Sequence, residues 1–215
     1  MTLKAIILDL DGVITDTAEY HYLAWKRLAD EEGVPFDRQA NEALRGVSRR
    51  ASLEILLGEH VARYTEEQIQ EMMARKNAYY IAMLDSITPA DFLPGARELL
   101  HAIKAHGLKI AIGSASRNTM TVLMRLGIPD FFDGISDGYC VVRAKPAPDV
   151  FVYAAGLVGV PVTQCAVIED AESGVEAALT AGMTAVGVGP VERVGRAHFR
   201  YATTADVNLE EILAG

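Results

Sequence analysis

The sequence lacks a cysteine framework and an excess of positive charge. Its 215 residues include only two cysteines, Cys140 and Cys165, and no Cys-x-x-Cys pair. Such sparse cysteines argue against a disulfide scaffold and favour reduced thiols in a cytoplasmic protein. The formal net charge of −9 argues against nucleic acid or an anionic membrane surface as a general partner. A local basic pocket for a small anionic substrate stays compatible with that charge.

Long hydrophobic runs are also missing. No segment approaches the roughly 20 apolar residues that a membrane span needs, and we expect no signal peptide because residues 1–4 lead straight into a strand. No repeat and no heptad seam calls for a partner, so we expect a monomer. Half of the residues are nevertheless hydrophobic, which is enough for a sizeable core.

The hydrophobic pattern divides the chain into two kinds of segment. Residues 5–8 form a short apolar run typical of a buried strand. From 16 to 85 the periodicity is helical, with helices expected at 18–32, at 41–57 with a break near Gly46, and at 66–84 behind a capping box.

From residue 94 onward helices and strands alternate. Strands are expected at 108–113, 134–136, 165–168, 184–188 and 200–202, and helices at 94–105, 118–126, 148–156, 173–181 and 209–213. This order predicts an α/β fold, a Rossmann-like core with a parallel sheet and helices on both faces. An α-helical cap domain, residues 15–92, would be inserted into a core made of 1–14 and 93–215.

Two of the expected strands end in pairs of acids. Asp9 and Asp11 follow the first strand, and Glu169 and Asp170 follow strand 165–168. Because open α/β sheets place ligands at the carboxyl ends of their strands, we expect these acids to share one edge. Crowded carboxylates repel unless a cation relieves them, and oxygen ligands suit Mg²⁺. Each acid alone could instead be a cap or turn residue.

The first acidic pair has the residue types needed for phosphoryl transfer. A carboxylate such as Asp9 can attack phosphorus and form an aspartyl phosphate, and Asp11 is placed to act as general acid and base. Thr17 and His21 lie one helical turn apart close behind them. Thr17 could merely cap the helix, whereas His21 could orient Asp11, sense closure of the cap, or have only a structural role.

Two further segments could bind a phosphoryl group. Ser114 to Asn118 follow an expected strand and begin a helix, where hydroxyl and backbone N–H groups bind phosphate well, although an ordinary helix cap has the same composition. Lys145 lies in a proline-rich loop and could neutralise a transferring phosphoryl group. An isolated surface lysine would be the simpler interpretation.

Together these residues resemble the four motifs of the haloacid dehalogenase-like phosphotransferases. The match covers the whole chain in order and consists of Asp9-Leu10-Asp11-Gly12-Val13, Ser114, Lys145 and Glu169-Asp170. The resemblance implies that Asp9 is phosphorylated and that Ser114 and Lys145 hold the transferring group. It further implies that Mg²⁺ is bound by the carboxylates of Asp9, Glu169 and Asp170 and by the backbone carbonyl of Asp11.

The segments 45–49, 75–77 and 114–118 are in addition similar to those of sugar-phosphate mutases within that superfamily. This implies interconversion of β-glucose 1-phosphate and β-glucose 6-phosphate through an aspartyl phosphate and a glucose 1,6-bisphosphate. Arg45 and Arg117 stand where lysine is usual in such enzymes. The residues expected to hold the sugar phosphate or bisphosphate are Asp11, Gly46, Val47, Arg49, Ser52, Lys76, Ser116, Arg117 and Asn118.

A mutase needs a second, distal phosphate anchor, for which Arg49 can supply a bidentate contact. Arg49 could instead belong to the exposed end of a helix. A sugar-phosphate phosphatase on the same scaffold would share the first half-reaction and use water as the acceptor, with no need for that anchor. A binding protein that has lost its chemistry is a third possibility, against which the presence of every acidic and basic motif residue argues.

Overall fold

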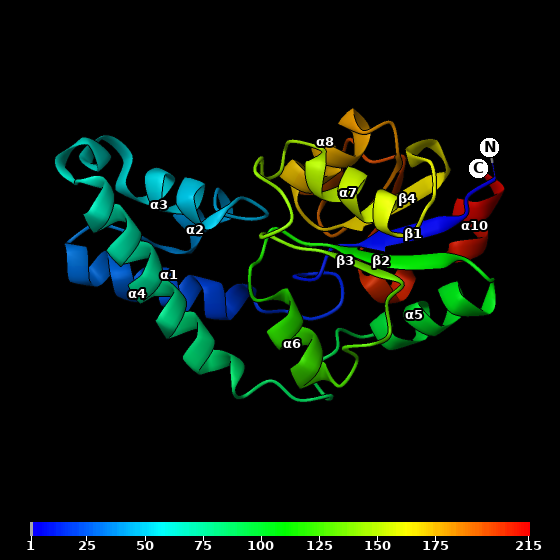
Figure 1. The fold of residues 1–215 in the computed structure, drawn as a ribbon, viewed down its shortest axis with the longest axis horizontal. Helices are drawn as coiled ribbons and strands as arrows, with labels where there is room; N and C mark the ends of the chain where they lie inside the picture. The colour runs from blue at the N-terminus through cyan, green and yellow to red at the C-terminus, as the bar shows by residue number, and fades with distance from the viewer. Residues whose placement is uncertain (1) are drawn as a thin grey trace.

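Six parallel strands form one sheet in the order β3-β2-β1-β4-β5-β6. The computed structural model describes residues 2–215. The fold confirms the expected α/β architecture with a Rossmann-like sheet (Figure 1). The strands are β1 Ala5–Leu8, β2 Lys109–Gly113, β3 Gly134–Ser136, β4 Cys165–Glu169, β5 Thr184–Val188 and β6 Phe199–Tyr201.

Helices cover both faces of this sheet because its central strands are apolar on both sides. Ile6 and Leu8 of β1 point into one hydrophobic cluster and Ala5 and Ile7 into another. In Figure 1 the two layers of helices lie above and below the strands. The first cluster is covered by α5 Ala96–Ala105, α6 Thr119–Leu126 and α10 Leu209–Ala214, and the second by α7 Asp149–Leu157, α8 Glu172–Thr180 and α9 Val191–Val194.

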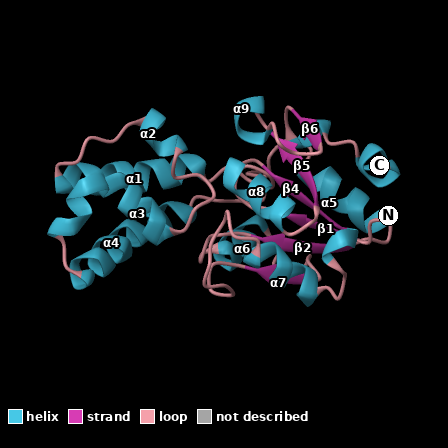
Figure 2. Cartoon of the chain, turned by 90° about the horizontal axis from the view of Figure 1, so that it is seen from above, coloured by secondary structure: helices cyan, strands magenta, loops and turns pink. Residues whose placement is uncertain are grey.

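A separate group of helices, which we call the cap, lies at one end of the sheet. It has its own hydrophobic cluster, in which Trp25, Leu28, Leu53 and Met72 are buried. Figure 2 shows the cap beyond the ends of the strands. Its elements are α1 Ala18–Glu32, α2 Arg38–Glu42, α3 Arg49–Leu57, a 3₁₀ helix Gly58–Arg63 and α4 Glu66–Leu84.

Two cap helices agree closely with the sequence prediction, and a third agrees in the place of its break but not in its start or in the length of the break. The bounds of α1 and α4 are as expected, and Thr65 and Gln68 form the capping box. The third, expected at 41–57 with a break near Gly46, does break there: α2 ends at Glu42, α3 begins at Arg49 and ends at Leu57, and residues 43–48 between them are not helical. Ser48 caps α3 by accepting a hydrogen bond from the backbone N–H of Ala51, and Gly46 turns the chain with a φ of +70°. A left-handed residue cannot continue a right-handed helix.

In the core the differences are small. The last strand, expected at 200–202, lies at Phe199–Tyr201. Helix α9 and the 3₁₀ turns Val162–Gln164 and Thr204–Asp206 were not expected. Such short elements leave no readable period in the sequence.

The chain passes between the core and the cap twice, and the two crossing segments are tied together. Thr15 donates its hydroxyl to the carbonyl of Asp91 at 2.6 Å, and the backbone N–H of Leu93 donates to the carbonyl of Ile14 at 2.9 Å. Since Ile14 lies just after β1, this pairing holds the cap over the carboxyl edge of the sheet. We propose that the domain boundaries lie here, between 14 and 15 and between 92 and 93.

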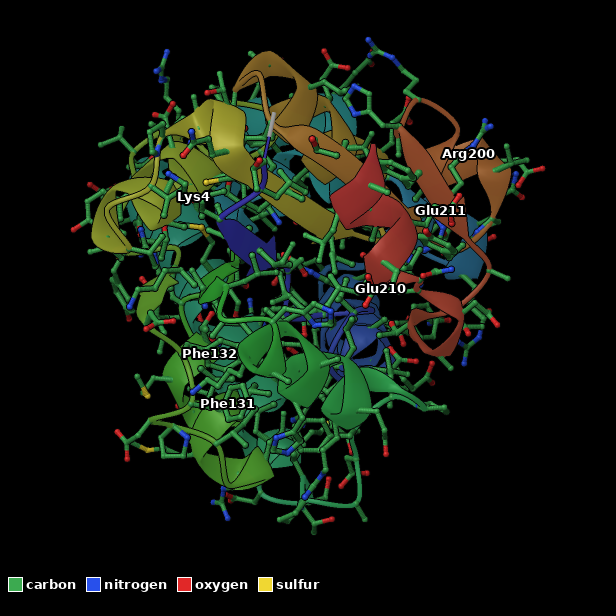
Figure 3. The ribbon with its side chains drawn as sticks, turned by 90° about the vertical axis from the view of Figure 1, so that its right-hand side faces the viewer. Lys4, Phe131, Phe132, Arg200, Glu210 and Glu211 are labelled. Carbon is green, nitrogen blue, oxygen red and sulfur yellow. The ribbon has the colours of Figure 1, made fainter. Side chains whose placement is uncertain are left out.

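Among residues 2–215, no comparable group of helices covers the opposite end of the core. Figure 3 shows this end, with Lys4 ahead of β1 and with Glu210 and Glu211 on α10. No helix among residues 2–215 has the length and hydropathy to cross a membrane.

Candidate active site

The register of the strands brings the two acidic strand ends together. Leu8 of β1 is paired with Ile168 of β4, so Asp9, just past β1, and Glu169, the last residue of β4, lie side by side. The backbone N–H of Asp9 donates to the carbonyl of Ile168 at 2.9 Å. On the other side Leu8 is paired with Ile112 of β2, two residues before Ser114. Three loops therefore meet at one edge, as the sequence predicts.

Lys145 lies between the two carboxylates. Its Nζ is 2.5 Å from Asp9 Oδ1 and 2.6 Å from Glu169 Oε1, and all three side chains are buried. Burial alone would lower the pKa of Lys145, but the two carboxylates raise it above its ordinary value. The lysine is therefore a fixed cation next to Asp9, where a transferring phosphoryl group would gather negative charge.

Asp11 has a different environment from Asp9. Burial, and next the charge of Asp9, raise the pKa of Asp11 to about 7. The hydroxyl of Thr17 donates to Asp11 Oδ1, while the backbone N–H of Asp11 donates to Asp9 Oδ2 at 2.9 Å. A carboxyl with a pKa near 7 can both give and take a proton at neutral pH. The two carboxyls thus have different environments: Asp9 lies against the Lys145 ammonium, and Asp11 can exchange a proton.

Asp170 binds two guanidinium groups. Arg45 of the cap and Arg193 of α9 each place Nη1 3.2 Å from Asp170 Oδ2. Burial and the nearby Glu169 and Asp9 carboxylates nevertheless raise the pKa of Asp170 well above its ordinary value. The side chain lies against the turn at Gly12, where an added Cβ would be 2.4 Å from Asp170 Oδ2. Asp170 is thus close to the loop that carries Asp9 and Asp11.

The acidic edge has the donor chemistry of a divalent-cation site. Asp9, Glu169 and Asp170 are buried carboxylates whose mutual repulsion a cation would relieve. Within residues 2–215, however, no group of three His, Cys, Asp or Glu side chains is arranged to hold a metal. Both Glu169 oxygens accept hydrogen bonds, one from Lys145 at 2.6 Å and one from the Ala171 N–H at 2.6 Å. The oxygens of Asp9 likewise accept from Lys145 and from the Asp11 N–H. By donor type the three carboxylates fit a magnesium ion.

The Ser114 loop is held open toward the same edge. Ser114 is buried, and its backbone N–H donates to the carbonyl of Ser136 in β3 at 3.0 Å. The Ser116 N–H donates to Ser114 Oγ at 3.1 Å, and the Asn118 N–H donates to Ser116 Oγ at 3.1 Å. Arg117 donates to the carbonyl of Gly138 at 3.2 Å. Hydroxyls, an amide and a guanidinium therefore line the loop that begins α6, as a phosphate site requires.

The cap contributes Arg49 to the opposite wall of the site. Arg49 is the first residue of α3, and Ser52, one turn later on the same side of the helix, is buried beside it. Burial, and next the charge of Arg117, lower the pKa of Arg49. The neighbouring Arg50 instead forms ion pairs with Glu54 and Glu66 at 2.6 Å each. Two cations, Arg49 and Arg117, therefore approach each other from cap and core.

Lys76 is buried deep in the cap without a carboxylate. Its Nζ is 2.9 Å from His21 Nδ1 and lies over the rings of Trp25 and Tyr80, 4.7 and 5.0 Å from their centroids. Among residues 2–215 no acidic side chain forms an ion pair with Lys76 or Arg49. Burial, and next Arg49, lower the pKa of Lys76 well below its ordinary value.

His21 contacts Lys76 rather than Asp11. Its ring stacks on Tyr80 with centroids 4.1 Å apart. Burial, with Lys76 and then Arg49 adding to it, lowers the pKa of His21 well below 6.5. Its placement fits a link between the cap helices, whereas Thr17 is the residue that holds Asp11.

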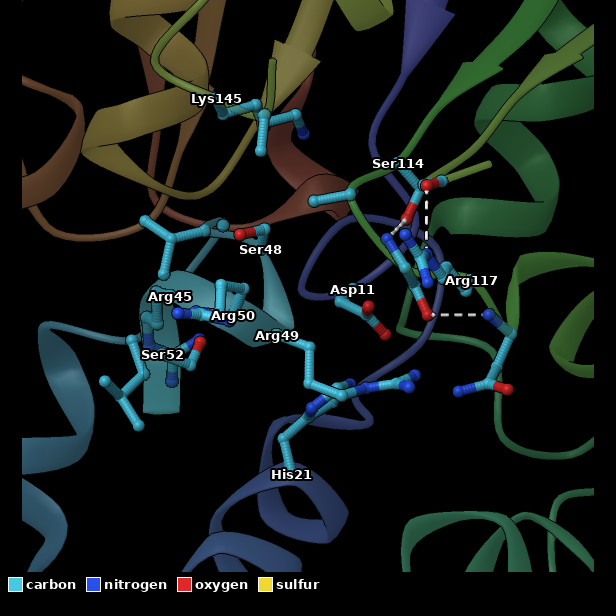
Figure 4. A pocket seen from close by; sticks show the side chains of 18 of the residues that line it. Asp11, His21, Arg45, Ser48, Arg49, Arg50, Ser52, Ser114, Arg117 and Lys145 are labelled. Atoms are coloured by element: carbon cyan, nitrogen blue, oxygen red, sulfur yellow. Dashed lines mark hydrogen bonds between the residues drawn. The ribbon is translucent and has the colours of Figure 1, made fainter. Parts of the chain in front are cut away.

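One cavity of about 450 Å³ joins these parts. Figure 4 shows Lys145 at one end and Arg49 and His21 at the other, with Asp11 between them. A volume of this size suits a phosphorylated sugar. The expected site residues among its lining are Asp9, Asp11, His21, Gly46, Val47, Arg49, Ser52, Lys76, Ser114, Ser116, Arg117, Asn118, Lys145 and Asp170, while Thr17 and Glu169 lie behind it.

Four residues near the cavity had no predicted role. Arg45 and Arg193 bind Asp170, and Asn77 and Tyr80 of α4 contact Arg49 and His21. The spacing of Tyr80, four residues after Lys76, could have indicated a shared helix face. Arg193 has no such signal, because only the tertiary fold brings α9 to Asp170.

Residues 3–182 match the sequence model of the haloacid dehalogenase-like hydrolases. The chain is 47% identical to a β-phosphoglucomutase of Bacillus subtilis over 97% of this chain and 93% of that protein. It is 35% identical to the fructose-1-phosphate phosphatase YqaB of Escherichia coli, with 85% and 95% covered. Its fold is similar to the crystal structure of a β-phosphoglucomutase from Clostridium difficile, with a TM-score of 0.94, 42% identity, and 98% and 95% of the two chains covered.

Proposed function

The chain belongs to the haloacid dehalogenase-like hydrolase family, and we propose that within it this protein is a β-phosphoglucomutase. The proposed reaction interconverts β-glucose 1-phosphate and β-glucose 6-phosphate. One observation supports it above the others, namely that cations lie at both ends of a single cavity. Lys145 lies next to Asp9 at the sheet end, and Arg49 and Arg117 approach each other at the cap end. A substrate with two phosphates needs both.

In the proposed reaction Asp9 carries the phosphoryl group. The phosphorylated Asp9 donates it to a sugar hydroxyl, and Asp11 accepts the proton of that hydroxyl. The bisphosphate then turns round, its other phosphate returns to Asp9, and Asp11 gives the proton to the oxygen that leaves. A pKa of about 7 suits Asp11 to both half-reactions. Thr17 keeps its carboxyl in place.

The remaining residues bind and neutralise phosphate in this proposal. Lys145 and Ser114 hold the transferring group, and Arg49, Ser116, Arg117 and Asn118 hold the other phosphate. Gly46, Val47, Ser52 and Lys76 would contact the sugar from the cap. The cap, residues 15–92, covers the cavity and excludes water, which would otherwise hydrolyse the aspartyl phosphate.

The proposal includes a magnesium ion at the acidic edge. Asp9, Glu169, Asp170 and the backbone carbonyl of Asp11 would hold it. The ion would offset the negative charge of the phosphoryl group during transfer. We further propose that the enzyme works in the cytoplasm as a monomer on sugar phosphates and bisphosphates, with no nucleic acid or membrane partner.

A coupled assay tests the function directly. Given β-glucose 1-phosphate, Mg²⁺ and a trace of β-glucose 1,6-bisphosphate, the protein should form glucose 6-phosphate much faster than it releases inorganic phosphate. Phosphate release at an equal or higher rate would favour a sugar-phosphate phosphatase, an activity named for the Escherichia coli relative. EDTA should stop turnover, and turnover that persists without any divalent metal would contradict the proposed magnesium site.

A further inference from the structure

Asn77 of α4 joins the cap to the core through a single oxygen atom. Its Oδ1 accepts a hydrogen bond from Arg49 Nη2 at 2.7 Å and another from Asn118 Nδ2 at 2.9 Å. Arg49 belongs to the cap and Asn118 to the loop that begins α6 in the core. Both donors belong to the distal phosphate site described above, whereas Asn77 itself does not line the cavity.

The chemistry of the three groups determines which way each amide faces. A guanidinium has only donors, so Asn77 must present its oxygen to Arg49. The same oxygen faces Asn118, which must then present its NH₂ group. This assignment follows from the donors alone and does not depend on seeing hydrogen atoms.

We propose that Asn77 is a positioning residue that holds Arg49 and Asn118 ready for the distal phosphate. This inference rests on the proposed mutase function. Because Arg49 and Asn118 both donate to this oxygen, a donor from the cap and a donor from the core converge on one point. Two donors that bind one phosphate oxygen would have to converge in the same way. Donors placed before the ligand arrives need less ordering when it binds.

The neutrality of the amide explains why an asparagine suits this position. Arg49 is half-buried and faces Arg117, so a partner that holds it in place is needed. A carboxylate would hold Arg49 equally well but would cancel the charge that attracts the phosphate. An amide oxygen accepts the hydrogen bond and leaves the positive charge of Arg49 for the ligand.

Two substitutions at Asn77 separate geometry from charge. Asn77→Leu has a similar volume but removes the acceptor, so Arg49 and Asn118 lose their common partner. Asn77→Asp keeps an acceptor oxygen and adds a negative charge. Gln39→Leu is the matched control, because Gln39 is an exposed amide on cap helix α2 that does not line the cavity.

The experiment uses the full chain and compares two readouts. The first is the KM for β-glucose 1,6-bisphosphate in the mutase assay, and the second is the radius of gyration of the ligand-free protein from small-angle X-ray scattering. We expect Asn77→Leu to raise KM about tenfold, the loss typical of a hydrogen bond to a charged group, and to increase the radius of gyration. We expect Asn77→Asp to raise KM by a similar factor at the wild-type radius.

The outcomes decide between this inference and simpler ones. A KM within twofold of wild type in Asn77→Leu would overturn it. Equal changes of both readouts in the Asn77→Leu, Asn77→Asp and Gln39→Leu variants would overturn it as well. If Asn77→Leu does not fold, Asn77→Asp tests the inference by itself. An unchanged KM in that variant would show that a carboxylate next to Arg49 does not weaken phosphate binding, and would overturn the inference. Failure of the wild-type chain to isomerise glucose 1-phosphate would instead refute the proposed function. The scattering comparison would still test whether the hydrogen bonds of Asn77 hold the cap against the core.

Discussion

At the sheet end of the cavity the buried cation Lys145 lies between two carboxylates. At the cap end the buried Lys76 and the half-buried Arg49 lie beside aromatic and amide groups instead. The buried lysine at the sheet end therefore has acidic partners before any substrate binds. The cap end has positive charge that nothing acidic in residues 2–215 pairs with. A buried cation without a partner lowers stability. Its presence at the cap end supports the proposal that an anionic ligand is its partner.

The most severe test of this contrast removes the nucleophile at the sheet end. Asp9→Asn should abolish formation of the phospho-enzyme and lower mutase turnover by on the order of 10⁴-fold or more, because an amide cannot attack phosphorus as a carboxylate does. Mass spectrometry of the phosphorylated protein and the coupled assay measure the two effects. Asp16→Asn, at an exposed acid that caps α1, is the control and should leave both nearly unchanged.

Removing the distal anchor should affect only reactions that use two phosphates. Arg49→Ala should lower kcat/KM of the mutase reaction by roughly 10²- to 10³-fold, the range expected when a charged donor to phosphate is lost. Hydrolysis of a small phosphate ester, which does not reach the cap end, should fall far less. Equal losses in the two assays would show that Arg49 has no distal role.

The contrast also predicts opposite changes in stability for two lysines. Lys145→Met leaves Asp9 and Glu169 without their cation and should lower the free energy of unfolding by about 3–5 kcal/mol. Lys76→Met removes a buried cation that has no acidic partner and should raise that free energy by roughly 1–3 kcal/mol, while mutase activity falls. Urea denaturation measures both. A loss of stability in each variant would mean that the two ends are built alike.

The smallest expected effect is a pH dependence at the cap end. The pKa of folded His21 lies well below 6.5, so below pH 6.5 the unfolded chain binds a proton there that the folded chain does not. The free energy of unfolding should therefore fall as the pH drops below 6.5, by up to about 1.4 kcal/mol per unit from this group. His21→Gln should lack that component, whereas His60→Gln, at an exposed histidine, should keep it. Denaturation curves between pH 7.5 and 5 test the difference.

The sequence was sufficient for the features that depend on local pattern. The apolar run before Asp9 predicted β1, the Thr65 capping box predicted the start of α4, and two acidic strand ends predicted their meeting at one edge. These predictions succeed because a buried parallel strand and an N-cap each leave a short, readable signature. Whether the residues at that edge act as proposed stays a prediction.

Contacts between segments far apart in the chain could not be read from the sequence. Arg45 and Arg193 reach Asp170 across 125 and 23 residues, and Asn77 reaches Asn118 across 41. The sequence predicted a break near Gly46 but not the length of the gap between α2 and α3. Asp37 and Ser48 cap these two helices, whereas the sequence pattern alone also allows a longer helix through the same residues. Tertiary placement decides both kinds of feature.

Gly46 lies where the cap touches the core. An added Cβ there would be 2.5 Å from Ser173 Oγ and 3.1 Å from Ala171 Cβ, and Ser173 Oγ donates to the carbonyl of Arg45 at 3.3 Å. A backbone resting on short side chains yields little, so this contact marks an end point for any rotation of the cap. The position of the cap sets how the acceptor oxygen, the phosphorus and the donor oxygen line up in the cavity. That alignment thus depends on the absence of a side chain at Gly46.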